Sequence, residues 1–220
     1  MIRRMELPRH ARILDVGCGK AEMLIRAIEQ CAGTGVGVDM NAAFLEAARD
    51  RAERRIPDGA LALYVSRIED LTFDLGTFDA VMCVGSTHAL GGYAESLAAL
   101  AAFARPGGVI VAGEGYWKQK PAPGYLEALG GTEDEYTTHE GNVAIGVERG
   151  LTRRFDFEST EADWAAYEDL YAETLERFVV EHPEDPDRDA MLARIRPWRA
   201  AYLAWGRATL GFGVYGFEKR

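Results

Sequence analysis

Two kinds of hydrophobic pattern alternate along the chain. Short runs rich in β-branched and other apolar residues are typical of buried strands, whereas segments with apolar residues every three or four positions are typical of amphipathic helices. The strand patterns cover residues 12–16, 35–39, 61–65, 78–84, 109–113, 151–158 and 210–218. The helix patterns cover residues 22–31, 41–52, 95–104, 125–129, 142–150, 160–181 and 187–205. This alternation predicts a doubly wound α/β fold around a seven-stranded, mostly parallel sheet.

The last third of the chain departs from simple alternation. Two long helix patterns lie between the sixth and seventh strand patterns, although a tight hairpin would suffice to make the last strand antiparallel. We therefore expect an antiparallel last strand and a small helical insertion over residues 160–208. Residues 116–142 contain the short helix pattern over residues 125–129 and then a polar stretch over residues 132–139, and they predict a lid or substrate loop. At 220 residues, we expect residues 1–220 to form a single domain.

A glycine-rich turn between the first strand and the first helix is the strongest chemical signal in the chain. Asp15 stands in the strand, and Gly17 and Gly19 follow, where backbone must bend through positive φ or lie against a ligand. The third glycine of a dinucleotide fingerprint would fall at Glu22, an acid that would repel a pyrophosphate at the helix N-terminus. Asp15 could instead accept from an ammonium group. An amino-acid-bearing nucleoside fits this polarity better than NAD.

A second acid supports a nucleoside site. Asp39 ends the second strand pattern and follows Gly19 by 20 residues. At this spacing an acidic residue on the second strand reaches the ribose hydroxyls of a nucleotide.

With Leu14-Asp15-Val16-Gly17-Cys18-Gly19 and Val38-Asp39 in place, the chain resembles the class I S-adenosylmethionine-dependent methyltransferases. The resemblance runs from about Ala11 to the C-terminus, and it implies a Rossmann-like methyltransferase fold and S-adenosylmethionine as cofactor, with S-adenosylhomocysteine as product. The loop after the third strand holds the adenine in this family, commonly with an acid, and here Arg67 takes the place of that acid. The cofactor-binding residues expected on this basis are Asp15, Gly17, Cys18, Gly19, Asp39, Met40, Arg67, Ile68, Glu69, Val84 and Gly85.

Polar and aromatic residues that follow the fourth and fifth strands are candidates for handling the acceptor. Ligands of open α/β sheets bind outside the carboxyl ends of the strands, so we expect His88 and Glu114 there as catalytic residues that align or deprotonate the acceptor. For His88, the alternative is a histidine that caps the next helix or orients the cofactor. The expected substrate-binding residues are Thr87, Tyr116, Trp117, His139, Trp164 and Tyr167, although aromatic residues at helical spacing are more often core.

Composition and charge limit the classes of partner that we expect the protein to bind. The formal charge of −10 argues against a general affinity for nucleic acid or anionic membranes and favours a small-molecule substrate. The arginines at 49, 51, 54 and 55 then form a solvated helix face. The four histidines and three cysteines show no metal-ligand spacing. No run is long enough to span a bilayer and no signal peptide is recognisable, so we expect a cytoplasmic location; a homodimer is possible.

These observations predict a methyltransferase that transfers a methyl group to a small-molecule acceptor by in-line displacement. Two alternatives stay open. One is a non-catalytic S-adenosylmethionine-binding regulatory module. The other, an NAD-dependent reductase, is disfavoured by Glu22 and by Pro121, which prevents Tyr116 and Lys120 from sharing a helix face.

Overall fold

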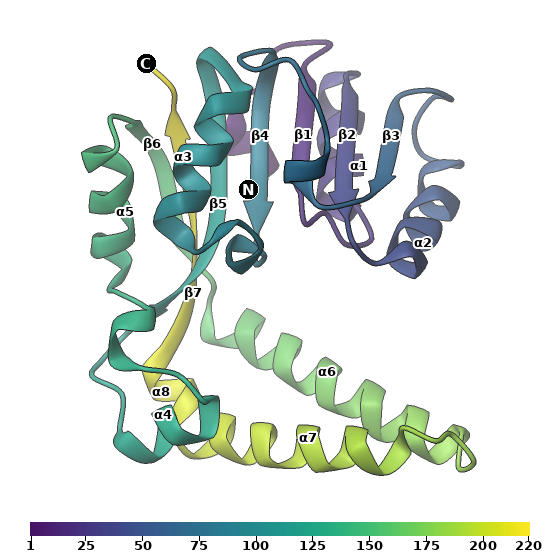
Figure 1. Ribbon diagram of the computed structural model, residues 1–220, viewed down its shortest axis with the longest axis vertical. Helices are drawn as coiled ribbons and strands as arrows, with labels where there is room; N and C mark the ends of the chain where they lie inside the picture. Colours follow the sequence, from purple (N-terminus) through teal and green to yellow (C-terminus); the bar gives the residue numbers. More distant parts are fainter. The chain divides into compact units, whose positions relative to one another are not determined.

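The computed structural model describes all residues, 1–220, and contains one seven-stranded sheet (Figure 1). The strand order is β3-β2-β1-β4-β5-β7-β6. The strands are β1 (Arg12–Val16), β2 (Thr34–Asp39), β3 (Leu61–Val65), β4 (Phe78–Val84), β5 (Ala104–Trp117), β6 (Thr152–Glu158) and β7 (Leu210–Glu218). Parallel pairing joins β1 to β2 and β4, β2 to β3, and β4 to β5, and the β7 arrow points opposite to β4. The predicted mostly parallel sheet with an antiparallel last strand is confirmed.

The main helices are α1 (Glu22–Cys31), α2 (Ala42–Ala52), α3 (Tyr93–Phe103), α4 (Pro123–Leu129), α5 (His139–Glu148), α6 (Glu161–Glu181), α7 (Arg188–Ala201) and α8 (Arg207–Thr209). Four 3-10 turns, η1 (Ile2–Met5), η2 (Ile68–Asp70), η3 (Thr87–Leu90) and η4 (Glu133–Glu135), and the π-helical η5 (Tyr202–Gly206) complete the elements. No helix combines the length and the apolar character that crossing a membrane requires.

The fifth strand is longer than the sequence pattern predicts. The hydrophobic pattern predicts a strand over residues 109–113, but β5 begins at Ala104 and includes the Arg-Pro-Gly-Gly segment over residues 105–108. The pairing register between β4 and β5 shifts between Phe78 and Ala80, and Gly107 has a φ of +72°. An irregularity in the ladder therefore accommodates the turn residues inside the strand, as in a β-bulge.

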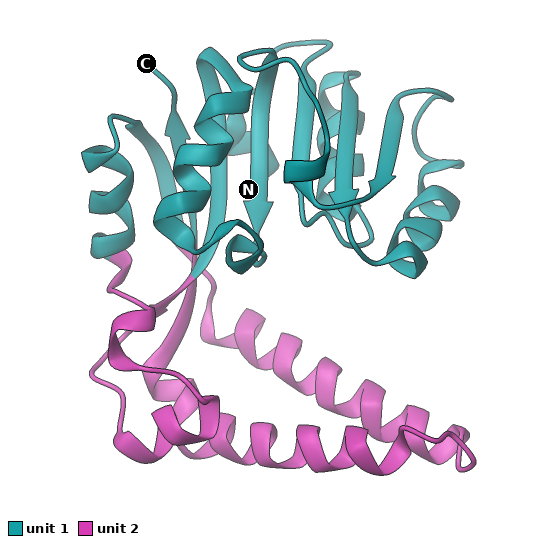
Figure 2. Cartoon of the chain, viewed as in Figure 1, with its two compact units in different colours: residues 1–114, 140–157, 214–220 teal, residues 115–139, 158–213 magenta.

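The chain divides into two compact units (Figure 2). The first comprises Met1–Glu114, Glu140–Phe157 and Val214–Arg220. Its core is apolar and continuous, from Leu14 and Val81 on the central strands to Leu97 and Leu100 on α3 and Tyr215 on β7. The central strands are buried on both faces, as parallel strands between helix layers must be.

The second unit comprises Gly115–His139 and Glu158–Gly213. Within it, α6 and α7 run side by side as a helical pair (Figure 1), and a small core gathers around Trp117, Tyr125 and Leu210. The Thr160 side chain caps α6 by accepting from the Asp163 N–H at 3.1 Å, and the Asp163 carboxylate accepts from the Thr160 N–H at 3.1 Å. This capping box begins α6 where the sequence predicts a helix start.

Candidate functional site

The glycine turn after β1 is held against the end of β2 by backbone and side-chain bonds. The N–H groups of Gly17 and Cys18 both donate to the Val38 carbonyl, at 2.8 and 3.1 Å. The Asp39 carboxylate accepts from the N–H of Gly19 and from that of Asn41, each at 2.8 Å. Two motifs that are 20 residues apart in sequence therefore form one rigid polar edge.

Gly17 is required at its position for two reasons. Its φ is +69°, which side chains rarely adopt, and an added Cβ would lie 2.4 Å from Ser86 Cβ. Ser86 follows β4 and its hydroxyl donates to the Gly17 carbonyl at 3.4 Å. Gly19 also has positive φ, +55°, but the space around it is open.

A cavity of about 460 Å³ opens beside this turn. Ligand pockets fall in the range of about 300–1,000 Å³. Five of the predicted cofactor residues line it, namely Gly17, Asp39, Met40, Arg67 and Ile68, together with the predicted catalytic residue His88. Its walls combine apolar groups with a carboxylate, a guanidinium, two hydroxyls and an imidazole.

The other six predicted cofactor residues do not line the cavity wall. They are the buried Asp15, and Cys18, Gly19, Glu69, Val84 and Gly85. Glu69 forms an ion pair with Arg67. Conversely, the sequence analysis did not select Val16, Val38, Ser66, Ser86 and Ala89, which do line the cavity. These five residues lie at the carboxyl ends of strands or shortly after them. Because those ends face the cavity, this position in the sequence could have identified them as lining residues.

Asp15 is the most perturbed acid of the turn region. The residue is 3% exposed, and burial, reinforced by the nearby Asp39 charge, raises the pKa of its carboxyl to about 8. Burial likewise raises the pKa of the Cys83 thiol to about 12 and that of the Cys18 thiol further, so both thiols stay protonated and unreactive at neutral pH. A cation placed near Asp15 would relieve the cost of its ionisation.

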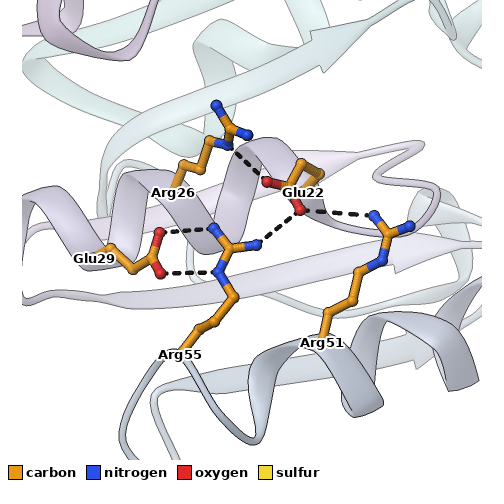
Figure 3. A network of polar contacts seen from close by, with 5 residues as sticks. All are labelled: Glu22, Arg26, Glu29, Arg51 and Arg55. Carbon is orange, nitrogen blue, oxygen red and sulfur yellow. Dashed lines mark hydrogen bonds and ion pairs between the residues drawn. The ribbon is translucent and has the colours of Figure 1, made fainter.

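Glu22, at the start of α1, does not act as a free negative charge. Figure 3 shows its carboxylate between three arginines, with Arg26 Nε at 2.6 Å and Arg55 Nη1 at 2.8 Å, while Arg51 Nη1 is 3.6 Å away. Arg55 also forms a two-pronged pair with Glu29. The hydrogen bonds from Arg26 and Arg55 lower the pKa of Glu22. Two of the four clustered arginines are thus committed to ion pairs between α1 and the α2 region, and Glu22 is not an unpaired repulsive charge.

The two predicted catalytic residues occupy different surroundings. His88 is exposed on η3, whereas the Glu114 carboxylate, near the end of the first unit's part of β5, accepts a hydrogen bond from the buried Thr87 hydroxyl. The Ser96 hydroxyl donates to the Thr87 carbonyl at 3.0 Å. The bond between Thr87 and Glu114 therefore joins the start of η3 to β5.

The remaining predicted substrate residues belong to the second unit. Tyr116 donates to the Glu158 carboxylate and its ring meets that of His139 edge-on at 5.3 Å. The Trp117 indole donates to the Glu133 carbonyl at 2.8 Å. Trp164 stacks on Tyr167, with 5.8 Å between ring centroids. Within this unit the aromatic residues mainly pack against one another, as the sequence analysis allowed.

No group of three or more His, Cys, Asp or Glu side chains is arranged to hold a metal ion.

Comparisons with known proteins agree with this geometry. A family model described as "Methyltransferase domain" matches residues 13–108. The uncharacterized protein YjhP of Escherichia coli is 29% identical over 218 residues, which cover 95% of this chain and 85% of that protein. The X-ray structure of YjhP superposes with a TM-score of 0.92 at 27% identity, over 100% of this chain and 90% of the other.

A crystal structure of an S-adenosylmethionine-dependent methyltransferase from Geobacter sulfurreducens, in complex with S-adenosyl-L-homocysteine, has the same TM-score of 0.92 at 25% identity. It covers 100% of this chain and 88% of the other. Taken with the glycine turn, the Asp39 carboxylate that accepts from Gly19 and the sheet order, these similarities support a class I S-adenosylmethionine-dependent methyltransferase.

Proposed function

We propose that this methyltransferase binds S-adenosylmethionine in the cavity beside the glycine turn and transfers its methyl group to a small-molecule acceptor by in-line displacement. The observation that carries the cofactor site is the Asp39 carboxylate. It uses two of about four acceptor positions on the N–H groups of Gly19 and Asn41, which leaves two for a vicinal diol. A ribose presents such a diol.

The other groups of the cavity match the rest of that cofactor. Ile68, with Val16 and Val38, offers apolar surface for a purine ring, and Arg67 also lines the cavity. The Gly17–Gly19 turn and Asp15 would hold the amino acid end, where an ammonium group would favour the ionised form of Asp15. Cys18, Met40, Glu69, Val84 and Gly85 complete the proposed shell around the cofactor.

When bound, S-adenosylmethionine supplies a methyl group attached to a sulfonium sulfur, and this sulfur is left as a neutral thioether after the transfer. The protein then needs to align the acceptor and exclude water. We assign His88, which lines the cavity, to take a proton from an acceptor that must lose one. Glu114, held by Thr87, would align the acceptor, and Tyr116, Trp117, His139, Trp164 and Tyr167 would contribute to its binding, with residues 116–142 as the lid.

Three features favour a small-molecule acceptor over a nucleic acid. The formal charge is −10, two of the clustered arginines, Arg51 and Arg55, are paired with acids, and the cavity is of small-ligand size.

The test is a transfer assay with methyl-tritiated S-adenosylmethionine and a bacterial extract separated into low-molecular-weight, protein and nucleic-acid fractions. The proposal predicts label in the low-molecular-weight fraction, and His88→Ala should lower the rate without weakening S-adenosylhomocysteine binding. Label confined to protein or nucleic acid would contradict the proposed acceptor class. Cofactor binding with no transfer to any fraction would favour the regulatory module.

A further inference from the structure

A second pocket lies within the helical pair of the second unit. It measures about 390 Å³ and lies between α6 and α7. Six residues line it, three of them aromatic: Tyr167, Tyr171 and Trp198, with Glu168, Arg194 and Ile195. Of these six residues, the proposed methyl transfer uses Tyr167 alone, as a residue that contributes to acceptor binding. Aromatic faces around a cavity attract organic cations, and most strongly those with alkylated ammonium groups.

One wall of the pocket carries a buried acid. Glu168 is 6% exposed, and one carboxylate oxygen accepts from the Trp198 indole N–H at 3.0 Å. Burial raises the pKa of Glu168, although the Trp198 bond and the Arg199 charge oppose that shift. Arg199 is itself paired with Asp169 at 3.1 Å. A buried carboxylate with a single hydrogen-bonded neighbour gains more from an adjacent cation than an exposed one does.

A cation also lines the pocket. The Arg194 guanidinium is exposed and donates to the Tyr171 hydroxyl at 3.3 Å. It would disfavour a ligand that is only cationic, but it has the geometry to pair with a carboxylate. The pocket therefore offers one acidic and one basic side chain, from neighbouring helices, around an aromatic lining.

We propose that the pocket between α6 and α7 binds a small zwitterion that carries an ammonium group and a carboxylate. The ammonium group lies against Glu168 and the rings of Tyr167, Tyr171 and Trp198. The carboxylate lies against Arg194. No residue lines both this pocket and the proposed cofactor cavity, and the occupancy of this pocket does not depend on methyl transfer.

Three probes separate the contributions of the ammonium group and of the carboxylate to binding. Glycine betaine carries both charges, its carbon isostere 3,3-dimethylbutanoate lacks the cation, and tetramethylammonium lacks the carboxylate. Calorimetric titration of the full chain, without S-adenosylmethionine, should show betaine binding at least about tenfold more tightly than either analogue, since cation–π and charge-assisted contacts are each of that order. Equal affinity for betaine and either analogue, or no betaine binding, would overturn the proposal.

Variants locate the binding to this pocket. Glu168→Gln keeps the size of the side chain and an acceptor for Trp198, and it should weaken betaine at least about tenfold. Tyr167→Ala removes a wall that is 63% exposed, so folding should survive while betaine affinity falls. Leu170→Ala is the matched control, because Leu170 is 64% exposed on the same helix and does not line the pocket. Betaine affinity that is unchanged in both Glu168→Gln and Tyr167→Ala would refute the site.

Discussion

The buried carboxyl of Asp15 makes a quantitative prediction about stability. Its pKa is raised from 3.8 to about 8 by burial and by Asp39, so the folded protein holds a proton there at neutral pH and the unfolded chain does not. Stability rises with pH only where the unfolded state binds more protons, and here it binds fewer. The Asp15 contribution to the free energy of unfolding therefore falls as pH rises from about 4 to about 8.

The magnitude follows from the size of the pKa change. Between pH 5 and pH 7 the folded-state Asp15 stays mostly protonated while the unfolded one is ionised, and each pH unit then costs about 1.4 kcal/mol. Across the two units, Asp15 should remove about 2–3 kcal/mol from the stability of the cofactor-free protein. Asp15→Asn keeps the shape of the side chain without the titration, so it should lose this part of the pH dependence.

The assay is urea unfolding of wild type, Asp15→Asn and Asp50→Asn at pH 5 and pH 7 without cofactor. Asp50 lies exposed on α2 and serves as the control for replacing an aspartate. The difference in stability between Asp15→Asn and wild type should grow by about 2–3 kcal/mol in favour of the variant from pH 5 to pH 7. A constant difference would show that Asp15 titrates as an ordinary exposed acid and would refute the reasoning.

Three further changes have expected outcomes. Gly17→Ala places a Cβ 2.4 Å from Ser86 Cβ at a φ of +69°, so calorimetry should show lost S-adenosylhomocysteine binding, whereas Gly59→Ala, which has positive φ but open space, should retain it. Thr160→Ala removes the cap of α6 and should cost about 1 kcal/mol in urea unfolding; no loss would mean that the cap is dispensable. Arg55→Ala should cost under about 1 kcal/mol, with the loss shrinking in high salt, because the Glu22 and Glu29 pairs are partly exposed; a loss of several kcal/mol would contradict this.

The fold was most predictable in the segments where a clear hydrophobic pattern and candidate cofactor-binding residues occur together. The buried runs that contain Asp15 and Asp39 predict strands and not helices. Each run is short, is flanked by glycines or acids, and is followed by an amphipathic helix. The spacing of Gly19 and Asp39 predicted that both residues belong to one nucleoside site, and in the structure the Gly19 N–H donates to the Asp39 carboxylate. The hydrophobic pattern predicted a helix over residues 160–181, and in the structure Thr160 and Asp163 form a capping box at the start of α6.

Other features depend on contacts that a single sequence does not encode locally. The extension of β5 through residues 105–108 follows from the pairing of Ala104 with Phe78 on β4 beyond the irregularity in the ladder, and from backbone bonds of Gly107 and Gly108 to Lys219. The approach of Ser86 to Gly17 joins residues 69 positions apart. The ion pairs of Arg55 with Glu22 and Glu29 also join residues that are distant in sequence. Because of them, Glu22 at the start of α1 is a paired acid and not the repulsive charge that the sequence suggested.

The central claim is that Asp39 and the glycine turn bind S-adenosylmethionine. It is tested most directly by calorimetric titration of wild type, Asp39→Ala and the exposed α2 control Glu46→Ala with S-adenosylmethionine, S-adenosylhomocysteine and NADH. We predict binding of the first two ligands but not of NADH, unchanged in Glu46→Ala and weakened by about 1–3 kcal/mol in Asp39→Ala, the scale of a lost hydrogen bond to a ligand hydroxyl. Equal binding by wild type and Asp39→Ala, or tighter binding of NADH, would contradict the claim.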